Sequence, residues 1–168
     1  MKRLLLLTAL ALTACGIQAP ARDNAQWTST VQGVEITWRA TAPGGLGQIK
    51  DGPVVGHAAN LPGGVYCVID LDLAQARHEL VRVAAHEAGH CFQFRYLLPG
   101  IPRPDLGPYT AGGVEGFAET YARAYLAACG DSLRPLGMTD FRAPSCDEAP
   151  DPRTVAVTFQ MPPDRPQP

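Results

Sequence analysis

One stretch of the chain repeats its apolar residues at the spacing of an α-helix. These positions recur from Leu73 to Leu98, and a Pro-Gly pair at 99–100 ends the pattern. Asp72 and Gln75, three residues apart, match a helix capping box. We therefore expect a helix over residues 73–98 that begins at an Asp72 cap and forms the centre of a small domain.

Two histidines lie four residues apart inside this expected helix. His86 and His90 would stand one turn apart, so both imidazoles can point at one ion, with Glu87 beside it. A metal there lowers the pKa of a bound water to about 7, and the carboxylate takes its proton. This H-E-x-x-H pattern predicts zinc ligands at both histidines and a general base at Glu87. The alternative is a buried helix with two satisfied histidines, although two polar rings and a carboxylate are costly in a core unless they have partners.

A second expected helix supplies a further ligand, which a zinc site needs. A proline-rich loop over 99–113 precedes it, and the helix should run from about Val114 to Cys129, with Gly130 as its stop. Glu115 and Glu119 lie four residues apart on one of its faces. Without a metal they would form a solvated face, where acids suit the N-terminal end of a helix.

These two motifs resemble those of the gluzincin metallopeptidases, the group of thermolysin and the zinc aminopeptidases. Their third ligand is a glutamate on a following helix, which the aminopeptidases carry as N-E-G-F-A. The chain has E-G-F-A at 115–118, with Val114 in place of the asparagine. The resemblance covers about residues 85–120. It implies that Glu115 is the third zinc ligand and that Glu119 accepts the second ring N–H of His86.

The remaining pattern predicts strands around these helices. Alternating residues at 27–40, around Gly33, indicate a strand or hairpin, and 63–71 with Val54-Val55 indicate one or two more. Residues 154–160 suggest a last strand, and 161–168 a disordered tail. We expect an α+β fold over residues 27–160. It would be a minimal zincin-like domain with a short β-sheet packed on the long active-site helix and a glutamate-bearing helix after it.

Other residues are candidates for roles near the expected site. Tyr109 is the first candidate for stabilising an oxyanion, and Tyr121 the second, although either can be a packing or surface tyrosine. His78 is expected to be exposed at the helix start, and His57 to lie in a loop. The expected strand at 65–69 could bind an extended peptide by strand addition.

The first residues have the features of a bacterial lipoprotein signal. A basic start, an apolar stretch and small residues precede Cys15, which resembles a lipobox. The resemblance implies a signal peptide over 1–14, a lipid on Cys15, a tether over 15–26, and an exported protein anchored to a membrane of the bacterial cell envelope. The alternative is an ordinary secretory signal with an incidental Cys15.

Four further cysteines suit an oxidising compartment. An even number predicts two disulfides, and four cysteines allow three pairings. Cys129 with Cys146 is the local choice, which leaves Cys67 for Cys91, but the sequence leaves the pairing open. Some of these cysteines can instead be buried and free.

Charge and motifs together narrow the function. The net charge is −2 without a basic run, so nucleic acid is not an expected partner. The favoured prediction is a membrane-anchored zinc metallopeptidase acting on peptides or cell-envelope proteins. The alternative is a non-catalytic envelope lipoprotein that serves as a binding or assembly module. Its structural zinc would take a fourth protein ligand, such as His57 or a free cysteine. A third reading is a zymogen or pseudo-enzyme gated by the 99–113 loop.

Overall fold

A computed structural model describes residues 25–49, 52–60, 66–140 and 145–160. Within these ranges a four-stranded mixed sheet and three α-helices make a small α+β domain, which confirms the predicted fold class. The signal peptide over 1–14, Cys15 with most of its tether, and the tail over 161–168 lie outside the described residues.

The sheet has the strand order β1-β2-β6-β5. Strands β2 and β6 are parallel, and the two outer pairs are antiparallel. A separate two-stranded ribbon joins β3 to β4. The bounds are β1 Gln26–Val31, β2 Val34–Thr41, β3 Gln48–Ile49, β4 Gly52–Pro53, β5 Gly56–Asn60 and β6 Tyr66–Asp72. Strands β1 and β2 form the hairpin predicted around Gly33, and its two turn residues have the positive φ values that suit a tight hairpin.

One face of the sheet is apolar and buried. In β2 every second residue from Val34 to Ala40 is buried, and in β6 Cys67, Ile69 and Leu71 occupy the matching positions. Because side chains alternate along a strand, these residues share one face, on which α1 packs. The β-branched and aromatic composition of both segments explains their strand conformation.

Helix α1 spans Arg77–Tyr96 and begins later than the sequence predicted. Asp72 ends strand β6, and its carboxylate accepts hydrogen bonds from the Ala74 amide at 2.9 Å and the Gln75 side chain at 3.2 Å. The predicted cap therefore closes a turn, since aspartate side chains compete with helices for nearby amides. The N-cap is Ala76, which makes no side-chain capping bond, and Leu97 ends the helix with a left-handed φ.

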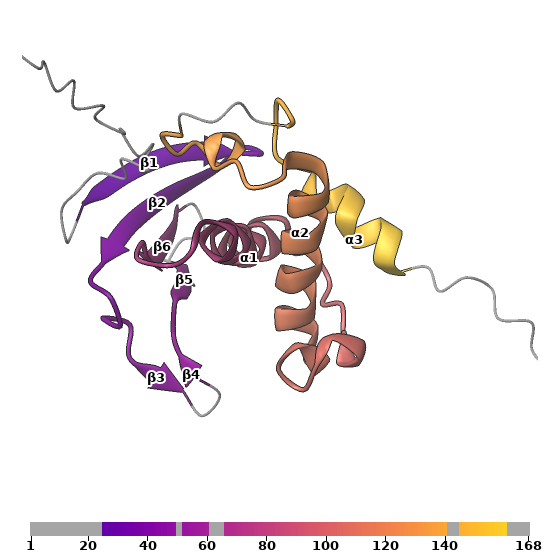
Figure 1. The fold of residues 1–168 in the computed structure, drawn as a ribbon. Helices are drawn as coiled ribbons and strands as arrows, with labels where there is room; N and C mark the ends of the chain where they lie inside the picture. Colours follow the sequence, from indigo (N-terminus) through magenta and orange to yellow (C-terminus); the bar gives the residue numbers. More distant parts are fainter. Residues whose placement is uncertain (1–24, 50–51, 61–65, 141–144, 161–168) are drawn as a thin grey trace, which may run out of the picture.

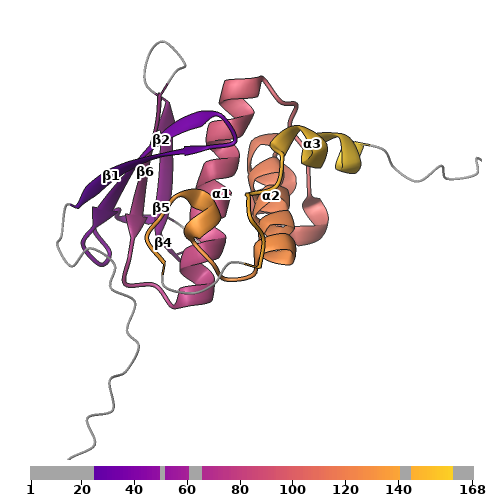
Figure 2. The same ribbon diagram turned by 90° about the horizontal axis from the view of Figure 1, so that it is seen from above.

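Helix α2 spans Gly113–Cys129, close to its predicted limits, and Gly130 follows with a positive φ of 58°. Figures 1 and 2 both place α1 between the sheet and α2, so α1 forms the middle layer of the domain. Every residue of α1 from Val83 to Gln93 is buried. The two helices approach most closely at Gly89, where an added Cβ would come within 3.0 Å of the Ala118 Cα.

The predicted last strand at 154–160 is wrong. These residues belong to helix α3, Pro152–Gln160. Asp151 precedes it and accepts a hydrogen bond from the Arg153 amide at 2.9 Å, which is the role of a helix N-cap. Proline at the first helical position suits a helix start as well. The β-branched residues indicated a strand, but the Asp-Pro pair before them decides the local structure.

Two disulfides tie the layers together. Cys67 of β6 is bonded to Cys91 of α1, and Cys129 at the end of α2 is bonded to Cys146. Of the three connectivities that four cysteines allow, the structure has the one that joins the sequence neighbours Cys129 and Cys146. All four cysteines are used in these bonds.

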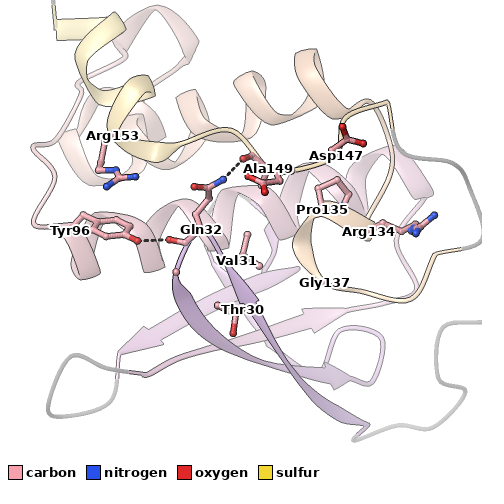
Figure 3. A pocket seen from close by; sticks show the side chains of 12 residues that line it. Thr30, Val31, Gln32, Tyr96, Arg134, Pro135, Gly137, Asp147, Ala149 and Arg153 are labelled. Carbon is pink, nitrogen blue, oxygen red and sulfur yellow. Dashed lines mark hydrogen bonds between the residues drawn. The ribbon is translucent and has the colours of Figure 1, made fainter.

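A groove of about 590 Å³ opens at the β1–β2 turn (Figure 3). The Gln32 side chain donates a hydrogen bond to the Ala149 carbonyl at 2.6 Å, and the Tyr96 hydroxyl donates to the Gln32 carbonyl. The Arg153 guanidinium lies 5.3 Å from the centre of the Tyr96 ring. These contacts fasten the hairpin to the end of α1 and to the segment before α3. No residue of the histidine cluster described below lines this groove.

Candidate metal centre

The two histidines of α1 converge with a glutamate of α2. Oε2 of Glu115 lies 3.1 Å from Nε2 of His86 and 3.3 Å from Nε2 of His90. One donor atom from each residue lies within 4.8 Å of the other two. Both rings are buried, whereas Glu115 is partly exposed, so the cluster opens toward solvent on the α2 side. This group can hold a metal ion.

The distances from the glutamate oxygen to the two imidazole nitrogens fit a tetrahedral ion. Zinc bonds of about 2.0–2.1 Å in tetrahedral geometry put neighbouring ligand atoms about 3.3 Å apart. Both Nε2–Oε2 distances are close to that value. Two imidazole nitrogens and one carboxylate oxygen are a ligand set that zinc accepts, and three protein ligands leave a tetrahedral position for another group. The residues present therefore fit zinc, although they do not by themselves select it over other divalent metals.

Local sequence explains how the three side chains meet. Histidines four apart on α1 face the same neighbour, and Glu115 lies in the first turn of α2. The close crossing at Gly89 and Ala118 brings the helix axes near enough for the glutamate to reach both rings. The small residues Gly89 and Ala118, which belong to the H-E-x-x-H and E-G-F-A segments, therefore allow the close packing of the two helices.

Glu119 lies on the other side of the His86 ring. Its Oε2 is 3.5 Å from Nδ1 of His86, within ion-pair range, although Nδ1 has no well-formed hydrogen bond among the described residues. The same oxygen is 2.8 Å from the Arg82 guanidinium, and Oε1 is 3.1 Å from that of Arg123. Sequence reasoning missed both arginines. The available signal was Arg82 one turn before His86 and Arg123 one turn after Glu119.

The carboxylates control protonation in the metal-free cluster. Burial lowers the pKa of His86, but the carboxylates of Glu115 and Glu119 outweigh it and raise that pKa to about 9. Burial raises the pKa of Glu115, but hydrogen bonds from His86, His90 and Tyr109 outweigh it and bring that pKa well below its usual range. At neutral pH the metal-free cluster therefore holds an ionised Glu115 beside a protonated His86.

Glu87 is buried beside the cluster. Its burial raises the pKa of its carboxyl, while the nearby charges of His86 and His90 act in the opposite direction. A carboxylate with a raised pKa is a better proton acceptor near neutral pH. Strand β5 leaves room for it at Gly56, where an added Cβ would lie 2.9 Å from Oε1 of Glu87.

Tyr109 covers the outer side of the cluster. Its ring stacks near that of His86, with centroids 6.4 Å apart, and 55% of its surface is exposed. Burial and the neighbouring Glu115 carboxylate both raise the pKa of its phenol, which is therefore protonated at neutral pH. The segment that carries it is held in place, because Gly116 packs so closely that an added Cβ would come within 1.9 Å of the Ile101 carbonyl.

The other candidates lie elsewhere. Tyr121 is fully buried and donates a hydrogen bond to the Pro150 carbonyl, so it is not the second oxyanion candidate. His57 lies in strand β5 rather than in a loop, opposite Asp70. His78 is exposed in the first turn of α1, as predicted. The strand predicted at 65–69 to add a peptide is wrong, since β6 is paired on both sides and β5 is the edge strand next to α1.

The fourth ligand suggested for a structural zinc site is not supplied by its named candidates. All four described cysteines are in disulfides, and His57 is outside the metal-binding group found among the described residues. Neither of the two fourth ligands named as examples for a structural site therefore joins the cluster in the described part of the chain.

In comparisons with known proteins, no protein-family profile, curated protein or solved structure matches the chain. In the described part of the chain, no helix has the length and apolar character needed to cross a membrane. The two disulfides indicate an oxidising or extracellular compartment.

Proposed function

We propose that this protein is a zinc metallopeptidase of gluzincin type that hydrolyses peptides or cell-envelope proteins. One observation supports the proposal: a carboxylate oxygen of α2 lies 3.1 and 3.3 Å from the Nε2 atoms of two histidines of α1, and the three residues form a group that can hold a metal ion. His86, His90 and Glu115 would hold the ion. Glu87 lies beside them without belonging to the ligand group, which is the position a general base needs.

Bound zinc would polarise the scissile carbonyl and make a water molecule acidic. Glu87 would accept a proton from the attacking water and later deliver it to the leaving amine. Its buried position and raised pKa support both roles, because a catalytic acid–base works best with a pKa near the working pH. The Tyr109 phenol, protonated and half-exposed above the His86 ring, would donate a hydrogen bond to the developing oxyanion.

Edge strand β5 supports binding of an extended peptide. Among the described residues it pairs with β6 on one side and with no strand on the other, and its Gly56 lies against Glu87. A peptide aligned along the free edge of β5 would make backbone hydrogen bonds and pass beside the metal. This replaces the strand at 65–69 as the proposed docking strand.

We further propose that the protein is exported and anchored in the bacterial cell envelope by lipid on Cys15. The two disulfides support export. The full chain and a Cys15→Ser variant would be expressed in a bacterium, and membrane and soluble fractions would be compared. We expect the full chain in the membrane fraction and the variant in the soluble fraction. An identical distribution of both would disprove the anchor.

The catalytic proposal is tested by separating zinc binding from hydrolysis. The parent protein and the variants Glu87→Gln, Glu115→Ala and Glu35→Gln would be assayed for zinc content and for cleavage of a denatured protein substrate. Glu35 is an exposed carboxylate on β2 and serves as the control. We expect Glu87→Gln to retain zinc but lose about 10²- to 10⁴-fold in rate. Glu115→Ala should lose zinc as well, and Glu35→Gln should match the parent.

Two results would contradict this proposal. A parent protein that binds no zinc would remove the metal site. Cleavage that survives Glu87→Gln undiminished would remove the proposed mechanism even if zinc is bound.

A further inference from the structure

We propose that Arg82 is a positioning residue of the metal centre, acting on the ion through Glu119 and His86. The inference rests on the proposed zinc site. It concerns a residue that lies outside both the H-E-x-x-H and the E-G-F-A segments, and it distinguishes two arginines that contact the same carboxylate.

The two ring nitrogens of His86 face different carboxylates. Nε2 faces Glu115, so a metal ligated there leaves the ring hydrogen on Nδ1. Nδ1 is buried and lacks a formed hydrogen bond among the described residues, and Oε2 of Glu119 is 3.5 Å away. A small movement of that oxygen makes or breaks the bond that orients the ring. The placement of Oε2 therefore decides how well His86 presents Nε2 to a metal.

Arg82 holds this particular oxygen. One guanidinium nitrogen lies 2.8 Å from Oε2 of Glu119, and two others donate to the Glu79 carboxylate at 2.7 and 3.1 Å. The planar fork is thereby fixed from both sides, which suits arginine better than lysine. Arg82 also lies one turn before His86 on the same helix, so the two side chains reach Glu119 from the same face of α1.

Arg123 contacts Glu119 differently. It binds Oε1, whereas the oxygen within 3.5 Å of His86 Nδ1 is Oε2, and its side chain is 56% exposed against 34% for Arg82. Because the Arg123 side chain is more than half exposed, solvent screens its contact with Glu119 and the i,i+4 pair contributes little. The geometry therefore assigns the orienting role to Arg82 and leaves Arg123 as a surface contact.

A purely structural role for Arg82 makes a different prediction. An arginine that only fastened α1 to α2 would lower the stability of the metal-free protein and affect zinc through general loosening. If Arg82 instead acts through Glu119, its substitution should not change zinc affinity further in a protein whose Glu119 has already been replaced. A double-mutant cycle separates the two roles.

The experiment compares the parent with Arg82→Gln, Arg123→Gln, Glu119→Gln and the double variant Arg82→Gln/Glu119→Gln. Zinc affinity would be measured by competition with a chelator, the site geometry by the visible absorption of the cobalt-substituted protein, and metal-free stability by thermal unfolding. We expect Arg82→Gln to lower zinc affinity about 10- to 100-fold and to change the cobalt spectrum. Arg123→Gln should cost less than about fivefold. Arg82→Gln should add nothing in the Glu119→Gln background.

Other outcomes overturn the inference in distinguishable ways. Equal losses in the two arginine variants, or losses that add in the double variant, would reduce Arg82 to a structural contact while the zinc site stands. If Arg82→Gln bound zinc as tightly as the parent, Arg82 would likewise be only a structural contact. A parent protein without zinc affinity would remove the proposed function together with the inference.

Discussion

At the scale of single residues, the spacing of His86 and His90 predicted that both rings face one point, and they do. Helical periodicity alone is sufficient for that part of the candidate site. The meeting with Glu115 depended on resemblance, because no local rule says that a residue of the next helix reaches the same point. Arg82 was not predicted, since its partner Glu119 is distant in sequence and only the packing of α1 on α2 brings them together.

Protonation of His86 gives the metal affinity a pH dependence. Its folded-state pKa of about 9 exceeds the ordinary 6.5, because the carboxylates beside it outweigh the effect of burial. Protonation therefore stabilises the metal-free fold fully below pH 6.5, and that stabilisation is lost as pH rises through 9. A metal must displace this proton, so the apparent zinc affinity should rise about tenfold per pH unit between pH 6.5 and 9. Chelator competition across this range measures it, and a flat profile would contradict it.

At the scale of elements, the hairpin at β1–β2 and the limits of α2 could be predicted from turn residues, alternation and the terminal Gly130. The predictions of secondary structure were wrong where the same residue types occur in two kinds of local structure. Asp72 matched a helix cap but closes a turn after β6, and the β-branched run of α3 matched a strand although Asp151 caps a helix. Short-range competition for backbone amides decided both cases.

The close crossing of α1 and α2 makes Gly89 a sensitive position. A side chain there would press on the Ala118 backbone, so Gly89→Val should push the helices apart and move Glu115 from the two rings. We expect a loss of about 1–3 kcal/mol in unfolding free energy from overpacking, together with weakened zinc binding. Denaturant unfolding and zinc titration measure both. Gly112→Ala is the control, since a Cβ at Gly112 meets nothing within 4 Å; equal effects in the two variants would contradict the argument.

At the scale of the whole molecule, composition and periodicity predicted the α+β class, but the strand order was out of reach. Strands β2 and β6 are parallel neighbours although β3, β4 and β5 lie between them in sequence. Such a pairing depends on long-range packing against α1 rather than on any local pattern. The disulfide pairing was open for the same reason.

The two disulfides should carry much of the stability of so small a domain. They close loops with sequence separations of 24 and 17 residues. Loop-closure entropy gives about 3 kcal/mol for each. We expect Cys129→Ser/Cys146→Ser to lower the free energy of unfolding by roughly that amount, measured by denaturant titration of the oxidised protein. Unchanged stability in this variant would show that the bridge adds nothing to the folded state.

Helix α1 is covered by the sheet on one side and by α2 on the other, so its central turns show no face to solvent. Most helices tolerate substitutions on a solvent-exposed face, but α1 has no such face from Val83 to Gln93. Changes that alter surface charge are therefore expected at exposed positions outside these turns, for example in the 99–113 segment. Divergent descendants of this protein would keep the central turns of α1 nearly unchanged, together with the buried residues that pack on them.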